Sequence, residues 1–307
     1  MRIAIASSSL LAVPLIEHLH ESIFGCAGII TVPDAPKGRG RELQPSELAI
    51  WAASSNIPLV KYESREVLAE FIRAQNIDLV VTLSFGKILP QELLDLPTHG
   101  WLNVHFSSLP KFRGAAPVQR SILAGEPSIG LTVFKLDAGM DTGGIYEQAD
   151  FQISPTETTE QLLSRLAAQS PTLVDKAICQ IQKGTFPTPQ DSERATYAEK
   201  ISSDEGHVDW RQSGESISRL ARALQENVGI WSEFRGSKLL LFSPTQTIVP
   251  SGATPGAILV SGAKNEPLTV ACSDGALSFA EVKVSGKKRM SSAEFIRGAR
   301  ITDEVLA

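Results

Sequence analysis

Residues 101–121, WLNVHFSSLPKFRGAAPVQRS, hold the pattern that decides the fold: an apolar strand-like stretch, a turn and a helical pattern. Similar strand candidates occur at 2–6, 27–32, 78–83, 102–106 and 130–136, and helical patterns lie between them at 9–20, 46–55, 64–75 and 115–123. Strands that are apolar almost throughout and alternate with helices are typical of a parallel, doubly wound α/β sheet covered on both faces. A long helical pattern at 157–184 closes this part of the chain.

The character of the chain changes after this helix. The segment 187–205 is polar and has no clear period, so we predict a linker there. A helical pattern at 213–225 follows, and then short strands separated by Gly, Pro and Ser turns, which predict a small β-barrel or sandwich. A length of 307 residues also favours two domains. We therefore expect domains at 1–186 and 206–307.

The amino terminus, MRIAIASSSLLAVPLIEHLH, superficially resembles a secretion signal. Ser7 to Ser9 interrupt its apolar run, so a first strand and helix explain it better. No apolar run approaches the length of a membrane span, and we expect a cytoplasmic protein.

The three cysteines (Cys26, Cys179 and Cys272) are far apart, and we expect them to be reduced and buried. With neither a CxxC nor an HExxH motif, we expect no metal.

Two common cofactor motifs are missing. The first strand-to-helix turn, Ala6 to Leu10, contains no glycine, although a dinucleotide pyrophosphate needs the close backbone approach that glycines permit. Gly38-Arg39-Gly40-Arg41 lacks the G-K-[ST] ending of a phosphate-binding loop. The sequence therefore does not predict NAD, FAD or ATP as a cofactor.

Asn103 and His105 are two residues apart on a predicted strand, so both side chains point to the same face. The segment KLDAGMDTG (135–143) then places carboxylates on a Gly-rich turn, just past the end of another predicted strand. In open α/β sheets, ligands bind beyond the carboxyl ends of strands, where we expect these groups to meet. An amide, an imidazole and a carboxylate that orients it suit acyl transfer, in which an oxyanion is stabilised and a proton moves.

The net charge of −5 argues against a protein that grips nucleic acid over its whole surface. The charge is uneven, because residues 206–307 carry 12 Lys/Arg and 10 Asp/Glu, while residues 1–205 hold the remaining −7. Any polyanion contact is therefore local. Two short basic clusters qualify, at 37–41 and 286–289, and a solvated surface is the alternative explanation for both.

The motifs NVH-x-S-x-LP-x-x-RG-x-x-P (103–117) and D-x-G-x-DTG (137–143) resemble those of the formyltransferase family that uses 10-formyltetrahydrofolate. Supporting segments run along nearly the whole chain: PDAPKGRG (33–40), SFGKILP (84–90), YAEK (197–200), DW (209–210), PGAIL (255–259) and GKK (286–288). The loop at 33–41 and the second domain resemble the members that formylate initiator tRNA. The chain departs from the family pattern at Ala6–Leu10 and at Asn227–Trp231.

The resemblance implies a Rossmann-like catalytic domain, a linker and a C-terminal domain like an OB barrel. It implies formyl transfer from 10-formyltetrahydrofolate, as co-substrate, to the α-amino group of methionyl-initiator tRNA, by a protein that we expect to be a monomer. Catalysis is assigned to Asn103, His105 and Asp141. The implied folate contacts are Phe85, Gly86, Ile88, Leu89, Pro90, Ser107, Ser108, Leu109, Pro110 and Asp137. The implied tRNA contacts are Lys37, Arg39, Arg41, Lys287, Lys288 and Arg289.

Other functions remain open on the sequence. A sugar N-formyltransferase or a formyltetrahydrofolate hydrolase would use the same catalytic set, but neither needs the 37–41 loop together with a basic second domain. A nucleic-acid-binding module would explain the barrel and the basic cluster at 287–289, yet it leaves Asn103, His105 and Asp141 without a purpose. Arg113 is predicted to contact either a substrate or a backbone carbonyl.

Overall fold

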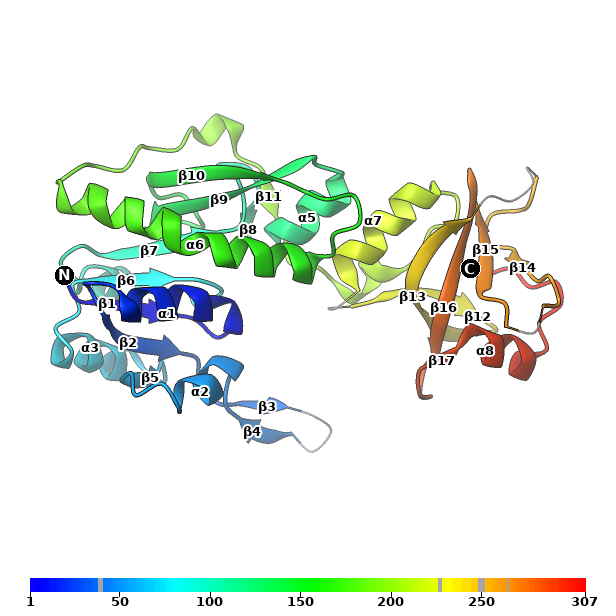
Figure 1. Cartoon of the computed structure of the whole chain (residues 1–307), viewed down its shortest axis with the longest axis horizontal. Helices are drawn as coiled ribbons and strands as arrows, with labels where there is room; N and C mark the ends of the chain where they lie inside the picture. The colour runs from blue at the N-terminus through cyan, green and yellow to red at the C-terminus, as the bar shows by residue number, and fades with distance from the viewer. Residues whose placement is uncertain (38–40, 226–227, 248–251, 264) are drawn as a thin grey trace. The chain divides into compact units, whose positions relative to one another are not determined.

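The computed structural model describes residues 1–37, 41–225, 228–247, 252–263 and 265–307. The chain divides into two compact units (Figure 1). The first unit comprises residues 1–117, 127–153 and 161–199, and the second comprises 118–126, 154–160 and 200–307. Each unit thus gathers segments that are separate in sequence, and the segment predicted as a linker is shared between them. The domain boundaries at 186 and 206 stay a prediction.

A seven-stranded sheet, in the order β10-β9-β7-β6-β1-β2-β5, forms the centre of the first unit. Its strands are β1 (Ile3–Ala6), β2 (Cys26–Thr31), β5 (Leu59–Lys61), β6 (Leu79–Thr82), β7 (Trp101–His105), β9 (Ser128–Lys135) and β10 (Ile145–Gln152). The five strands predicted from the sequence are all present. Two further strands were not predicted: β5, which has only three residues, and β10, which alternates between half-buried and exposed positions along most of its length.

The sheet is mixed rather than fully parallel. Strands β7, β6, β1, β2 and β5 run parallel to one another. Strand β9 runs antiparallel to β7, and β10 runs antiparallel to β9. The expectation of a parallel strand at 130–136 was therefore wrong, because β9 is almost fully buried and a buried apolar strand carries no signal of its direction.

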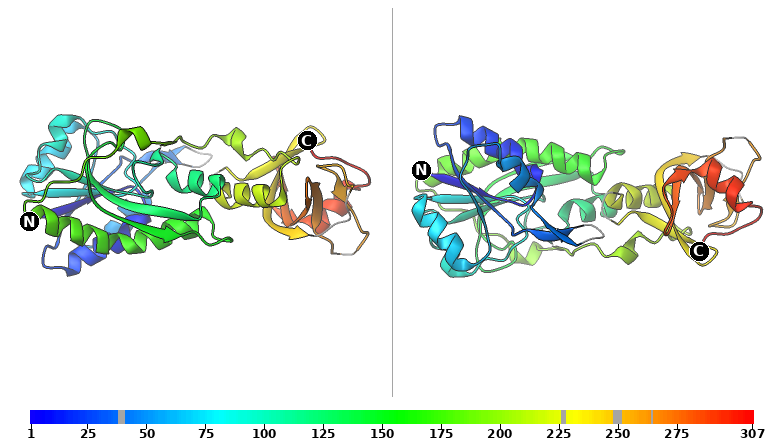
Figure 2. Two further views of the ribbon diagram at one scale, coloured as in Figure 1. Left: turned by 90° about the horizontal axis from the view of Figure 1, so that it is seen from above. Right: turned by 90° about the horizontal axis from the view of Figure 1, so that it is seen from below.

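Helices cover both faces of this sheet (Figure 2). They are α1 (Val13–Glu21), α2 (Glu47–Ala52), α3 (Arg65–Ala74), α4 (Gln91–Leu94) and most of α6 (Thr159–Gln182). Ser46 and Ser64 cap α2 and α3 by accepting backbone N–H hydrogen bonds from the first turn, as serine at an N-cap does. Leu68 and Ile72 of α3 pack into a core with Ala4 and Ala6 of β1, which fixes one face of the sheet.

The second unit is built on a curled antiparallel sheet in the order β12-β13-β16-β15-β14, with β17 paired to β16. These strands are β12 (Ile230–Phe234), β13 (Ser237–Thr247), β14 (Ile258–Leu259), β15 (Leu268–Cys272), β16 (Gly275–Val284) and β17 (Met290–Ser291), with helices α7 (Gly214–Leu224) and α8 (Ser292–Ala299). Trp210 is buried in its core, donates from Nε1 to Ser232 Oγ at 2.9 Å, and meets the Phe279 ring edge-on. The half-barrel confirms the predicted fold class.

The cysteines differ from expectation at one position. Cys26 and Cys272 are buried, as predicted, but Cys179 is exposed on α6. Burial raises the pKa of the Cys26 thiol to about 11. No helix within the described ranges is long and apolar enough to cross a membrane. The described residues likewise hold no group of three His, Cys, Asp or Glu side chains that could bind a metal.

Gly130 generates the first prediction. A Cβ at this position of β9 would lie 2.4 Å from the Ser108 backbone nitrogen and 2.3 Å from its Oγ. Because backbone has to move, we expect Gly130→Ala to lower the free energy of unfolding by about 1–3 kcal/mol in urea titrations. A Cβ at Gly298 of α8 meets nothing within 4 Å. Because alanine favours a helix more than glycine does, Gly298→Ala should raise the free energy of unfolding by about 0.5–1 kcal/mol. Equal stabilities of the two variants would contradict this packing.

Thiol labelling gives the second prediction. With a native sample at pH 8 and an excess of iodoacetamide, we expect Cys179 to be alkylated first. Cys26 should stay unmodified until the protein unfolds, because it is buried and little of its thiol ionises. Peptide mass spectrometry measures both sites, and rapid modification of native Cys26 would show that this part of the sheet opens readily.

Candidate active site

His105 ends strand β7 and is only 6% exposed. Its Nε2 lies 2.9 Å from the carbonyl oxygen of Phe112. A carbonyl can only accept a hydrogen bond, so Nε2 must carry the proton in this contact. The other ring nitrogen, Nδ1, is therefore the one left for chemistry: it accepts when the imidazole is neutral and donates when the ring is charged.

Asn103 lies two residues earlier on β7, between Thr82 of β6 and Phe134 of β9. Its position on the strand gives it the same face as His105. The residue is half-buried, and within the described part of the chain its side chain makes no hydrogen bond. A half-buried amide without a protein partner is a donor ready for a bound ligand.

Asp141 approaches the same site from the turn after β9. Its Oδ2 accepts a hydrogen bond from the backbone N–H of Gly114 at 2.7 Å and lies 3.9 Å from His105 Nδ1. That second distance is within ion-pair range but too long for a hydrogen bond. In this structure the carbonyl of Phe112 holds Nε2, Asp141 lies at ion-pair distance from Nδ1, and the orienting role of Asp141 stays a prediction.

The turn at Phe112–Gly114 is held by the segment predicted as a linker. Phe112 has φ 58° and donates its N–H to Thr196 Oγ1 at 2.8 Å. Arg113–Gly114 (β8) then pairs in parallel with Tyr197–Ala198 (β11). Gly114 has φ +122°, and a Cβ there would lie 2.8 Å from the Ala198 carbonyl oxygen, so only glycine fits this path.

Arg113 binds a side chain instead of the predicted backbone carbonyl, and the alternative of a substrate contact stays a prediction. The side chain is 3% exposed, and its Nε and Nη2 both donate to Oε1 of Gln190, at 3.1 and 2.7 Å. Gln190 Nε2 in turn donates to the carbonyl oxygens of Asp141 and Gly143. Gln190 and Thr196 were not predicted from the sequence, because a polar segment without a period gives no sign of which residues it contacts.

Residues 107–110, predicted to bind folate, begin two residues after the end of β7. The Ser107 side chain is fully buried and donates to the Lys111 carbonyl at 2.6 Å, and Leu109 is also buried. Ser108 is half-buried and donates to Asp150 at 2.5 Å. Ser107 and Leu109 thus stabilise the turn, while Ser108 and Pro110 have surface that a ligand can reach.

The loop after β6 carries the other predicted folate contacts. Phe85 and Leu89 are buried in the core beside α3, and the Phe85 ring stacks on Tyr62 at 6.2 Å. Between these anchors, Gly86 and Ile88 are exposed, and Ile88 is 91% exposed. A fixed loop that presents a large bare apolar side chain is suited to contact an aromatic ligand.

Asp137 lies away from His105, which the carboxylate of Asp141 approaches. The N–H of Leu136 donates to Trp101 at the start of β7, so Asp137 emerges at the opposite end of that strand from His105. The shared rim predicted from the sequence was wrong for this residue, because β9 is antiparallel. Asp137 accepts hydrogen bonds from Gly139 N–H and Thr142 Oγ1 and borders a hollow of about 310 Å³ beside α4.

The predicted tRNA contacts that the structure describes are divided between the two units. Lys37 ends β3 (Ala35–Lys37), which pairs with β4 (Glu42–Gln44); Lys37 and Arg41 are exposed, and Arg39 lies outside the described residues. Lys287 and Lys288 are exposed between β16 and β17. Arg289 pairs with Glu281 and stacks 4.0 Å from the centre of the Phe242 ring, so its charge is partly balanced.

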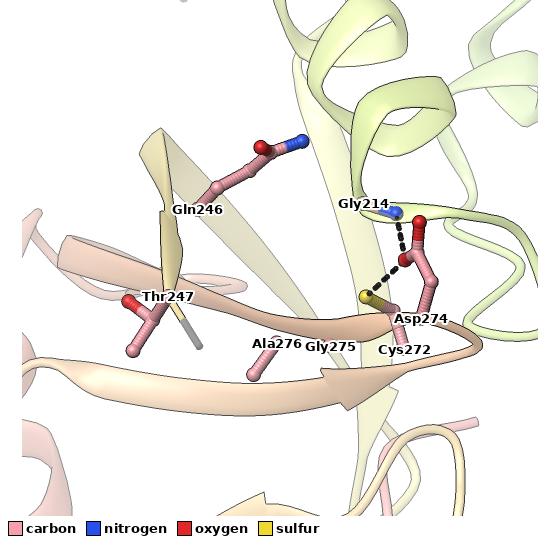
Figure 3. Close-up of a pocket in the computed structure, with 7 residues that line it drawn as sticks. All are labelled: Gly214, Gln246, Thr247, Cys272, Asp274, Gly275 and Ala276. Atoms are coloured by element: carbon pink, nitrogen blue, oxygen red, sulfur yellow. Dashed lines mark hydrogen bonds between the residues drawn. The ribbon is translucent and has the colours of Figure 1, made fainter. Parts of the chain in front are cut away.

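A separate hollow of about 360 Å³ opens in the second unit (Figure 3). Its lining comprises Gly214, Gln246, Thr247, Cys272, Asp274, Gly275 and Ala276. Asp274 accepts from the Gly214 N–H at 2.8 Å at the start of α7, and Cys272 Sγ lies 3.5 Å from the same oxygen. The only charged side chain in the described lining is therefore acidic and already hydrogen-bonded, which does not suit a phosphate group.

A mixed α/β sheet that gathers an amide, an imidazole and a carboxylate defines a group-transfer enzyme of the kind expected for acyl chemistry. Residues 1–178 match the formyl transferase family, and residues 200–300 match the C-terminal domain of the same family. The chain belongs to the formyl transferase family. A methionyl-tRNA formyltransferase of Solibacter usitatus is 35% identical over 308 residues, which cover 99% of this chain and 97% of that protein.

Solved structures share the fold at lower identity. Aquifex aeolicus HypX, in complex with tetrahydrofolic acid, superposes with a TM-score of 0.68 at 19% identity over 97% of this chain, which spans about half (48%) of HypX. A methionyl-tRNA formyltransferase from Clostridium thermocellum gives a TM-score of 0.57 at 17% identity, over 80% of this chain and 94% of that one.

Proposed function

We propose that this protein transfers the formyl group of 10-formyltetrahydrofolate to the α-amino group of methionyl-initiator tRNA. The observation that carries the proposal is similarity over the full length, both domains included, to proteins named for that reaction. The gathering of Asn103, His105 and Asp141 around one end of β7 supports it.

In the proposed reaction the amine nitrogen attacks the formyl carbon, and a tetrahedral oxyanion forms. Asn103 donates an amide N–H to this oxygen, and His105 donates a second hydrogen bond from Nδ1, since Nε2 is committed to Phe112. The C–N10 bond then breaks, and the amine proton passes to N10 of the folate. Asp141, 3.9 Å from Nδ1, balances the charge on the ring and helps carry that proton.

The donor would bind between the turns already described. The apolar side of the pterin fits the loop Phe85–Pro90, where Ile88 is bare, and the turn Ser107–Pro110 supplies polar contacts through Ser108 and through backbone. Asp137, at the other end of β7, remains a proposed polar contact for the folate, and its exposed carboxylate can accept from ring N–H groups.

The acceptor tRNA would meet the exposed cations on the two turns: Lys37 and Arg41 (with Arg39 between them in sequence), and Lys287, Lys288 and Arg289. A sugar N-formyltransferase or a formyltetrahydrofolate hydrolase would not need these contacts.

We further propose that the protein acts as a monomer in the cytoplasm, in agreement with its free cysteines. A dimer in sedimentation at working concentration would contradict the monomer.

The third prediction tests the chemistry. Wild-type protein, mixed with 10-formyltetrahydrofolate and methionyl-initiator tRNA, should produce formylmethionyl-tRNA. Removal of one oxyanion donor typically costs about 10²–10³ in rate, so we expect a decrease of this size in kcat for Asn103→Ala and for His105→Ala. The surface variant Asn265→Ala is the control and should match wild type. Formylation of an amino-sugar nucleotide, with none of the tRNA, would overturn the proposed acceptor.

The fourth prediction tests the basic turn on β3 and β4. We expect Lys37→Ala/Arg41→Ala to weaken tRNA binding and to reduce the slope of log K against log salt by about one for each phosphate that the variant no longer neutralises. Folate binding should not change. The control Lys176→Ala/Lys183→Ala removes the same charge from exposed positions on and just after α6. If both double variants weaken tRNA binding equally, the turn has no specific role.

A further inference from the structure

We propose that Gln190 is a positioning residue for formyl transfer: it holds the turn that presents Asp141 to His105, and Arg113 holds Gln190. This inference rests on the proposed function and adds a residue to its site. Gln190 comes from the polar segment that the sequence predicts as a linker, about fifty residues after Asp141, and belongs to the same compact unit as Asp141 and His105.

Every polar atom of the Gln190 side chain is used. Nε2 donates to the carbonyl oxygens of Asp141 at 2.9 Å and Gly143 at 2.8 Å, and Oε1 accepts from Arg113 Nε and Nη2. Carbonyls only accept and a guanidinium only donates, so the orientation of the amide is fixed by its partners. Neither a carboxylate nor a shorter amide can make all four bonds.

Gln190 binds the Asp141 backbone, which the hydrogen bonds of Asp137 within the turn do not reach. Asp141 has φ 55°, a conformation that non-glycine residues adopt at a cost. Within the turn, Asp137 binds Gly139 and Thr142, but neither bond reaches the Asp141 backbone. Position 143 admits only glycine, since a Cβ there would lie 1.7 Å from the Lys135 carbonyl oxygen. Gln190 therefore fixes the two carbonyls on either side of Thr142.

Arg113 ties this arrangement to the other side of the site. It is buried, and among the described residues its side chain has no carboxylate partner, so Gln190 supplies its hydrogen bonds. The preceding residue, Phe112, holds His105 Nε2, and the following residue, Gly114, holds the Asp141 carboxylate. One amide thus connects the turn that orients the imidazole with the turn that carries the carboxylate.

The fifth prediction uses Gln190→Glu, which keeps the acceptor for Arg113 and removes both donors to the turn. A catalytic group misplaced by about 1 Å can cost 10²-fold in rate. We therefore expect kcat to fall roughly tenfold to a hundredfold, while KM for both substrates stays within about threefold of the wild-type value. In an Asp141→Asn background the same substitution should have little further effect, because the two residues act through one contact. Additive decreases would show that Gln190 acts through something other than Asp141.

A substrate-free measurement separates this inference from the proposed function. The Gly114 amide donates to Asp141 Oδ2, so its hydrogen exchange, followed by NMR in the full chain, reports whether the carboxylate is in place. We expect faster exchange at Gly114 in Gln190→Glu and Gln190→Ala, and no change in Gln180→Ala, whose Nε2 donates to the Tyr146 carbonyl in the same unit. Unchanged Gly114 exchange would overturn the inference. Absence of tRNA formylation by wild type would overturn only the proposed function.

Discussion

The antiparallel pairing of β9 with β7 is the constraint on which the candidate site depends. Because β9 ends beside Leu102 at the start of β7, the chain leaves it at the end of the sheet away from His105. The turn at 137–144 then has to bring Asp141 back, and the N–H of Lys135 closes that turn on the Gly144 carbonyl. Segment 190–198 stabilises this turn from outside it. Gln190 binds the carbonyls of Asp141 and Gly143, and β11 pairs with β8 beside it.

The site is consequently a set of turns fixed by polar contacts around one rigid strand. Asn103 and His105 take their positions from β7, which is paired on both edges. Phe112, Gly114 and Asp141 take theirs from hydrogen bonds to Thr196 and Gln190 and from the β8–β11 pair. Because these contacts already hold the catalytic side chains in place, the side chains need to move little during the reaction. Hydrogen-bond donors that are preorganised toward an oxyanion are usually the largest single contribution to catalysis.

The sequence predicts the fold well where side-chain periodicity reports burial. The five apolar strands, the helices between them and the small β-rich second domain follow from that signal. Strand direction does not, so the antiparallel β9 and the true place of Asp137 could not be foreseen. The relation between Asn103 and His105 can be predicted, because two residues at positions i and i+2 of a strand point to the same face. Gln190 and Thr196 act across long sequence separations, and only the folded chain shows what they contact.

The most direct test of the account is a crystal structure of the protein with a stable formyltetrahydrofolate bound. Oxyanion donors lie about 2.7–3.1 Å from the oxygen they stabilise. We predict that the formyl group is held with its oxygen at about this distance from Asn103 Nδ2 and close to His105 Nδ1, while Nε2 stays on the Phe112 carbonyl. A folate bound with its formyl group away from β7, or a His105 ring turned off Phe112, would contradict the account.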